Sequence, residues 1–96
     1  RERQPEPPPR PASAPARQRL GYKRERALAE LPGRIEGLQA EIRSLQQALT
    51  DADLYRRDAA SFSTKTDRLG AAQAELEAAE TEWLELEMLR EELAKG

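Results

Sequence analysis

The residues of this sequence that are best suited to bind a ligand are basic, and they form two sets. Lysine and arginine hold phosphate groups by charge, which makes binding sensitive to salt and independent of base sequence. The entrance set lies at the start of the first expected helix and includes a tyrosine that could stack on a base: Arg17, Arg19, Tyr22, Lys23, Arg24 and Arg26. The turn set lies near the middle of the chain: Arg56, Arg57, Lys65 and Arg68. The sequence therefore offers two candidate nucleic-acid-binding surfaces.

Catalytic chemistry is not indicated by the remaining residues. The 96 residues include no histidine and no cysteine, so the commonest general base and the commonest zinc ligands are missing. The sequence has no glycine-rich phosphate loop and no nucleophile next to a plausible base. Neighbouring glutamates on a helix are interpreted as solubilising charges. We expect no catalytic residue, no metal site and no cofactor in this segment.

The charge is divided unevenly along the chain. Residues 1–26 carry eight lysines and arginines against three glutamates, while residues 27–96 carry eight against fifteen acids. The net charge of −2 thus combines a basic arm of +5 with an acidic body of −7. No stretch approaches the ~20 apolar residues of a membrane span, so we expect no membrane partner.

Proline dominates the first part of the chain. Six of the seven prolines lie in residues 1–19, where the missing amide hydrogens and fixed φ angles prevent a helix or a central strand. This segment is predicted to be a disordered Pro/Arg-rich linker that is partly polyproline II. A ligand for an SH3-type domain is an alternative, although a plain spacer is favoured.

Two heptad patterns follow the linker and predict an all-α fold. Apolar residues are spaced by three and four in the first pattern: Leu28, Leu31, Ile35, Leu38, Ile42, Leu45 and Leu49. The second pattern comprises Phe62, Leu69, Ala72, Leu76, Ala79, Trp83, Leu86 and Leu93. Residues 20–95 are expected to form an antiparallel two-helix coiled-coil hairpin, with helices at about 22–50 and 59–94. Pro32 should kink or break the first helix.

The short connection at residues 50–61 also predicts the register of the two helices. Asp58 is the expected N-cap of the second helix. Paired residues should have numbers that sum to about 111, so that Ala72 and Ala79 face Leu38 and Leu31 and Tyr22 lies near Leu89. This register brings the entrance set beside four acids that could neutralise it and repel phosphate: Glu85, Glu87, Glu91 and Glu92. Fewer acids are expected around the turn set: Asp51, Asp53, Asp58 and Asp67.

Several short motifs lie in an informative order. Leu20-Gly21-Tyr22-Lys23 precedes Leu31-Pro32 and the first heptads, Asp51-Ala52-Asp53-Leu54-Tyr55 forms the turn, and Trp83-Leu84-Glu85-Leu86-Glu87 lies near the end. This arrangement resembles the C-terminal domain of ABC-F ATPases of the Uup branch over roughly residues 20–90. Two positions depart from that family's pattern, since Ala59 replaces a proline after the capping aspartate and Arg24 replaces a glutamate.

The resemblance implies a function that the heptads alone do not. It implies a cytoplasmic parent ATPase with two ATP-binding cassettes, which would use ATP and Mg²⁺ outside this segment, and a C-terminal domain that binds DNA. Two alternatives stay open at this point. The hairpin could be an arm that docks on the ribosome or on a protein, or a structural element that folds back on the parent cassettes or self-associates.

Overall fold

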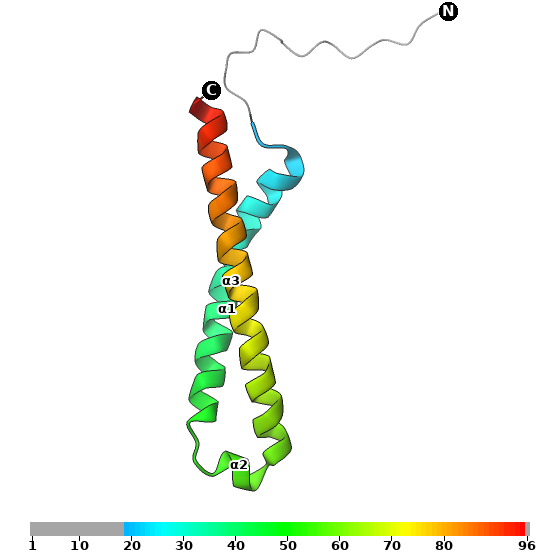
Figure 1. Ribbon diagram of the computed structural model, residues 1–96, viewed down its shortest axis with the longest axis vertical. Helices are drawn as coiled ribbons and strands as arrows, with labels where there is room; N and C mark the ends of the chain where they lie inside the picture. The colour runs from blue at the N-terminus through cyan, green and yellow to red at the C-terminus, as the bar shows by residue number, and fades with distance from the viewer. Residues whose placement is uncertain (1–18, 96) are drawn as a thin grey trace, which may run out of the picture.

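The protein folds as a long helical hairpin in the computed structural model, which describes residues 19–95. Helix α1 spans Tyr22–Leu49, the short helix α2 spans Leu54–Arg57, and helix α3 spans Ala59–Lys95. Helices α1 and α3 are antiparallel, so the start of α1 and the end of α3 lie at the same end of the molecule (Figure 1). The described residues contain no strand. The all-α hairpin predicted from the heptads is therefore confirmed, and the ends of its two long helices lie within one residue of the expected positions.

The predicted linker lies almost wholly outside the described residues, which begin at Arg19. Within the described helices, no segment is both long enough and apolar enough to cross a membrane.

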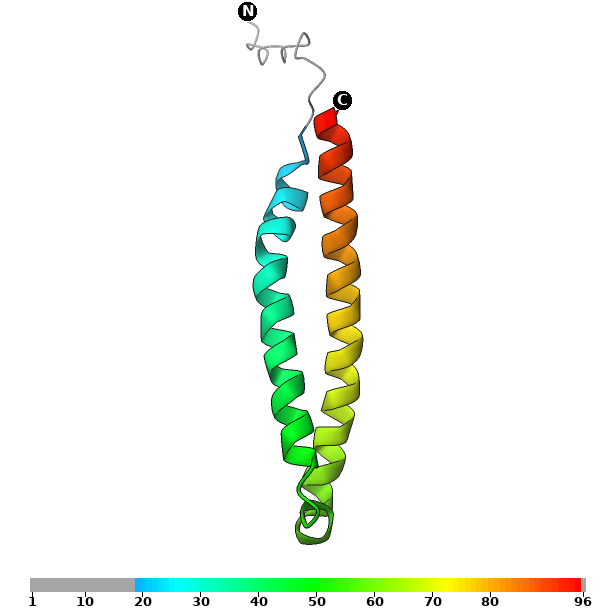
Figure 2. The same ribbon diagram turned by 90° about the vertical axis from the view of Figure 1, so that its left-hand side faces the viewer.

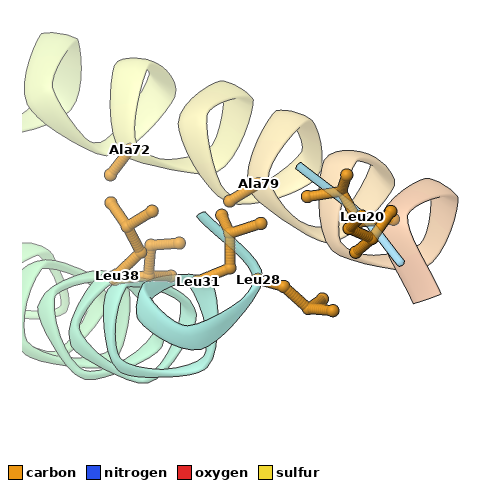
Figure 3. Close-up of a cluster of buried hydrophobic side chains, with 8 residues drawn as sticks. Leu20, Leu28, Leu31, Leu38, Ala72 and Ala79 are labelled. Atoms are coloured by element: carbon orange, nitrogen blue, oxygen red, sulfur yellow. The ribbon is translucent and has the colours of Figure 1, made fainter. Parts of the chain in front are cut away.

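The core is a single layer of apolar side chains between α1 and α3. Its buried members are Leu20, Leu28, Leu31, Leu38, Ile42, Ala72, Ala79 and Leu86. The side chain of Ala72 points toward Leu38 and that of Ala79 toward Leu31, as the register predicted (Figure 3). A small residue opposite a large one lets the two helices approach closely, and this places the alanines among the most buried residues of the chain.

Leu20, and not Tyr22, is the last core residue at the end of the hairpin where α1 begins. Leu20 is only 6% exposed and lies against the C-terminal part of α3 (Figure 3). Tyr22 is 76% exposed, so the expected position near Leu89 does not bury it. The periodicity missed Leu20 because this leucine precedes the helix and follows a proline-rich segment.

Pro32 lies inside α1, which continues through it as one helix. A proline has no amide hydrogen, so the carbonyl oxygen of Leu28 loses its usual helical partner and the helix bends. The N-terminal part of α1 diverges from α3 in Figure 1, and the whole helix bows in Figure 2. Of the two outcomes predicted for Pro32, the structure has the kink and not the break.

Aspartates organise the tip of the hairpin. The backbone N–H of Ser61 donates to Oδ1 of Asp58 at 3.0 Å, which confirms Asp58 as the cap of α3. The N–H of Asp53 donates to Oδ1 of Asp51 at 2.9 Å. Helix α2 was not predicted as a separate element. Its Tyr55 ring packs against the ring of Phe62 in a T-shaped arrangement, with centroids 5.4 Å apart. These local bonds fix where the chain reverses.

Candidate nucleic-acid interface

The entrance set lies where the described chain begins, on and just before the first turns of α1. Arg17 lies outside the described residues, while Arg19, Lys23 and Arg24 are all exposed. These three cations make no ion pair with another residue in the range 19–95. Their charge is therefore not used within the described hairpin, and it is available to a polyanion.

Tyr22 stands among these cations as an exposed aromatic ring. Its hydroxyl accepts a hydrogen bond from Nη1 of Arg26 at 3.0 Å, and Nε of Arg26 donates to Oε2 of Glu30 at the same distance. The bonds to Glu30 and Tyr22 raise the pKa of Arg26 above its ordinary value. A ring that is 76% exposed and held at its hydroxyl end can stack on an unpaired base.

The four acids at the end of α3 form no ion pair with the described residues of the entrance set. Glu87 forms an ion pair with Arg90 of its own helix at 2.6 Å. Within residues 19–95 no ion pair joins the entrance set to Glu85, Glu87, Glu91 or Glu92. The first turns of α1, which carry Lys23 and Arg24, diverge from α3 (Figure 1).

The turn set is divided by the structure. Arg56 donates to Oδ1 of Asp53 at 2.6 Å, and Arg57 donates to Oδ2 of Asp51 at 3.1 Å. The pKa of Asp51 is lowered first by the backbone N–H of Asp53 and then by Arg57. Both arginines remain well exposed, but each already has a carboxylate partner. The tip is thus a weaker candidate for binding phosphate than the entrance.

Arg68 belongs to a different structure, a bridge between the two long helices. Its Nε and Nη2 donate to the two carboxylate oxygens of Glu41 at 2.6 and 2.8 Å, and its Nη1 donates to Glu75 at 3.1 Å. Glu75 also lies 3.6 Å from Arg34. These bonds raise the pKa of Arg68 and lower that of Glu41. Arg68 therefore links α3 to α1, while Lys65 is half-buried nearby on α3.

The described residues contain no cluster of three or more acidic side chains arranged to hold a metal ion. The fold of the described residues is therefore that of a helical hairpin domain, with exposed basic residues at the end where α1 begins.

The chain belongs to the ABC transporter C-terminal domain family, whose profile matches residues 19–88. It is 43% identical over 84 residues to the ATP-binding protein Uup of Caulobacter vibrioides. The matched region covers 88% of this chain and 14% of that protein. The Uup-like ATP-binding protein of Haemophilus influenzae is 34% identical over 84 residues, a match that covers 88% of this chain and 18% of that protein. The ATP-binding protein Uup of Escherichia coli is 33% identical over 72 residues, a match that covers 75% of this chain and 11% of that protein.

These relatives place the domain in the Uup-like branch of the ABC-F proteins, which confirms the resemblance drawn from the sequence motifs. The chain spans less than a fifth of the length of each of these relatives. No solved structure matches the chain.

Proposed function

We propose that this domain is the non-catalytic nucleic-acid-binding arm of a cytoplasmic Uup-type ATP-binding protein, and that it binds DNA through the entrance set. The parent would hydrolyse ATP with Mg²⁺ in two cassettes outside this sequence. The observation that carries the proposal is the exposed ring of Tyr22 among three cations that have no partner within residues 19–95.

The chemistry of these groups favours DNA with unpaired bases. Lysine and arginine hold the phosphate backbone without reading sequence, whereas an exposed aromatic ring needs a base that has left its stack. A junction or a single-stranded tail supplies both partners, and an intact duplex supplies only the phosphates. We therefore expect branched or tailed DNA to bind more tightly than blunt duplex.

The affinity should fall steeply as salt is added. Three phosphates neutralised by Arg19, Lys23 and Arg24 give a slope of log affinity against log salt of about −2.7, which is a loss of roughly 40-fold between 50 and 200 mM salt. Replacing Lys23 and Arg24 with glutamine leaves one contact and a slope of about −0.9. Fluorescence anisotropy with labelled DNA at several salt concentrations measures both slopes.

Two matched pairs of variants locate the surface. Tyr22→Ala should weaken binding to tailed DNA by roughly tenfold and leave duplex binding unchanged, because about 1–3 kcal/mol per stacked base is lost. Tyr55→Ala is the control, since that ring is also exposed, at 62%, but lies at the tip. Likewise, charge reversal of Lys23 and Arg24 should reduce affinity far more than reversal of Arg56 and Arg57.

The outcomes separate the proposed functions. If charge reversal of Arg56 and Arg57 reduced DNA affinity more than reversal of Lys23 and Arg24, the turn set would be the binding surface. Absence of DNA binding at low salt, together with cosedimentation with ribosomes, would replace DNA binding with the docking role.

A further inference from the structure

A second surface of the hairpin is apolar and lies apart from the entrance set. An open groove of about 670 Å³ runs between α1 and α3 beside the only tryptophan of the sequence. We call it the Trp83 groove, and it is lined by Pro32, Ile35, Glu36, Gln39, Glu80, Trp83 and Leu84. Leu84 is 52% exposed and adds its side chain to the apolar wall of the groove.

The groove continues toward the end of the hairpin at which the described chain begins. A second hollow of about 430 Å³ shares Pro32 and Trp83 with the first, and its other lining residues are Glu25, Leu28, Ala29, Glu87 and Arg90. Four acids therefore line the two hollows, against one arginine that is already paired with Glu87. An occupant of this surface should combine apolar rings with positive charge.

We propose that the Pro/Arg-rich segment of this same chain, residues 7–11, binds in the Trp83 groove. Its sequence is Pro-Pro-Pro-Arg-Pro, and residues 1–18 as a whole carry four arginines against two glutamates. Proline rings pack on exposed tryptophan faces at little entropic cost, because the proline-rich backbone is already restricted. Arg10 would then face the acids of the groove wall, Glu36 and Glu80.

The length of the connecting chain allows this contact. Pro32 lies ten residues into the hairpin from Tyr22, which is about 15 Å along the helix. Pro11 precedes Arg19 by eight residues, which span about 25 Å in polyproline II geometry, so the segment can turn back and reach the groove. Because the tether keeps it at an effective concentration on the order of 1 mM, a contact with a Kd of about 0.1 mM would be roughly 90% occupied.

The same charges argue against a second copy of the hairpin in the groove. The exposed faces of α3 near Leu84 carry Glu77, Glu80 and Glu87, so two α3 helices placed against each other would repel. A segment of opposite charge from the same chain has no such cost. This inference goes beyond the proposed DNA binding and does not depend on it.

Tryptophan fluorescence of the full 96-residue chain tests the proposal, because Trp83 is the sole reporter. The test variant carries Pro7→Ser, Pro8→Ser and Pro9→Ser. The matched control carries Ala12→Ser, Ala14→Ser and Ala16→Ser, which introduces as many serines and keeps every proline. If the segment covers Trp83, acrylamide should quench the test variant about 1.5- to 2-fold more strongly than the wild type, and the control should match the wild type.

A change on the groove side completes a double-mutant cycle. Glu36→Gln with Glu80→Gln should raise acrylamide quenching of Trp83 in the wild-type background. The same pair should leave quenching unchanged in the proline-substituted background. Equal quenching in the wild type and the proline-substituted variant would overturn the proposal. So would wild-type quenching that falls as the protein concentration rises, since that result assigns the groove to a second copy.

Discussion

The packing of Leu38 against Ala72 leads to a quantitative prediction about the core. Leu38 is 5% exposed and Ala72 is completely buried. Leu38→Ala removes a buried side chain opposite a residue too small to fill the space, so the free energy of unfolding should fall by about 2.5–3 kcal/mol. This is the low end of the usual range, because the core is one layer thick and water can reach the cavity. A domain of this size has a total stability of only about 4–11 kcal/mol.

The matched control is Leu84→Ala, which makes the same chemical change on the surface of α3. Leu84 is 52% exposed, so the loss should be about 1 kcal/mol or less. The midpoint of thermal unfolding should therefore fall by roughly 10–20 °C for Leu38→Ala and by no more than about 8 °C for Leu84→Ala. Circular dichroism at the helical band measures both midpoints. Equal shifts for the two variants would refute the assigned register, because they would mean that Leu38 is no more buried than Leu84.

Two further predictions concern charge and backbone. Arg68 lowers the pKa of Glu41, so their ion pair stabilises the fold above the ordinary glutamate pKa and this contribution is lost as the pH falls through the lowered value. Glu41→Gln should thus lower the unfolding midpoint at neutral pH and flatten its decline in acid. Glu77→Gln, at an exposed position of α3, should do neither. Equal pH profiles for the two variants would contradict the bridge. Separately, an added Cβ at Gly37 or Gly70 would meet nothing within 4 Å, and neither glycine has a positive φ. The two Gly→Ala changes together should raise the free energy of unfolding by about 1–2 kcal/mol, measured in urea, and a loss of stability would mean that one of these positions is in contact.

The hairpin could be predicted from sequence because one repeating pattern determines it. Heptad spacing sets the buried face of each long helix, and a short connection makes the helices antiparallel. The match of Ala72 with Leu38 then followed from counting residues. Asp58 could be identified as a cap because capping depends only on neighbours in the chain.

Features that depend on the spatial relation of side chains from different elements were missed. Arg68 was assigned to the turn set by its sequence position, but its guanidinium group reaches Glu41, which lies 27 residues earlier. Leu20 lies outside any periodic segment, and its burial depends on the direction in which the chain approaches α3. Neither could be found by a pattern that describes one helix at a time.

The bend at Pro32 connects these observations to the proposed function. A straight α1 would run beside the acidic end of α3, and the expected register then places Glu85, Glu87, Glu91 and Glu92 against the entrance set. In the structure the start of α1 diverges from α3 instead (Figure 1), and within residues 19–95 no ion pair joins the entrance set to those acids. The same proline lines the Trp83 groove. A residue that costs the helix one hydrogen bond thus lies between the two proposed binding surfaces, so replacing Pro32 should affect both of them.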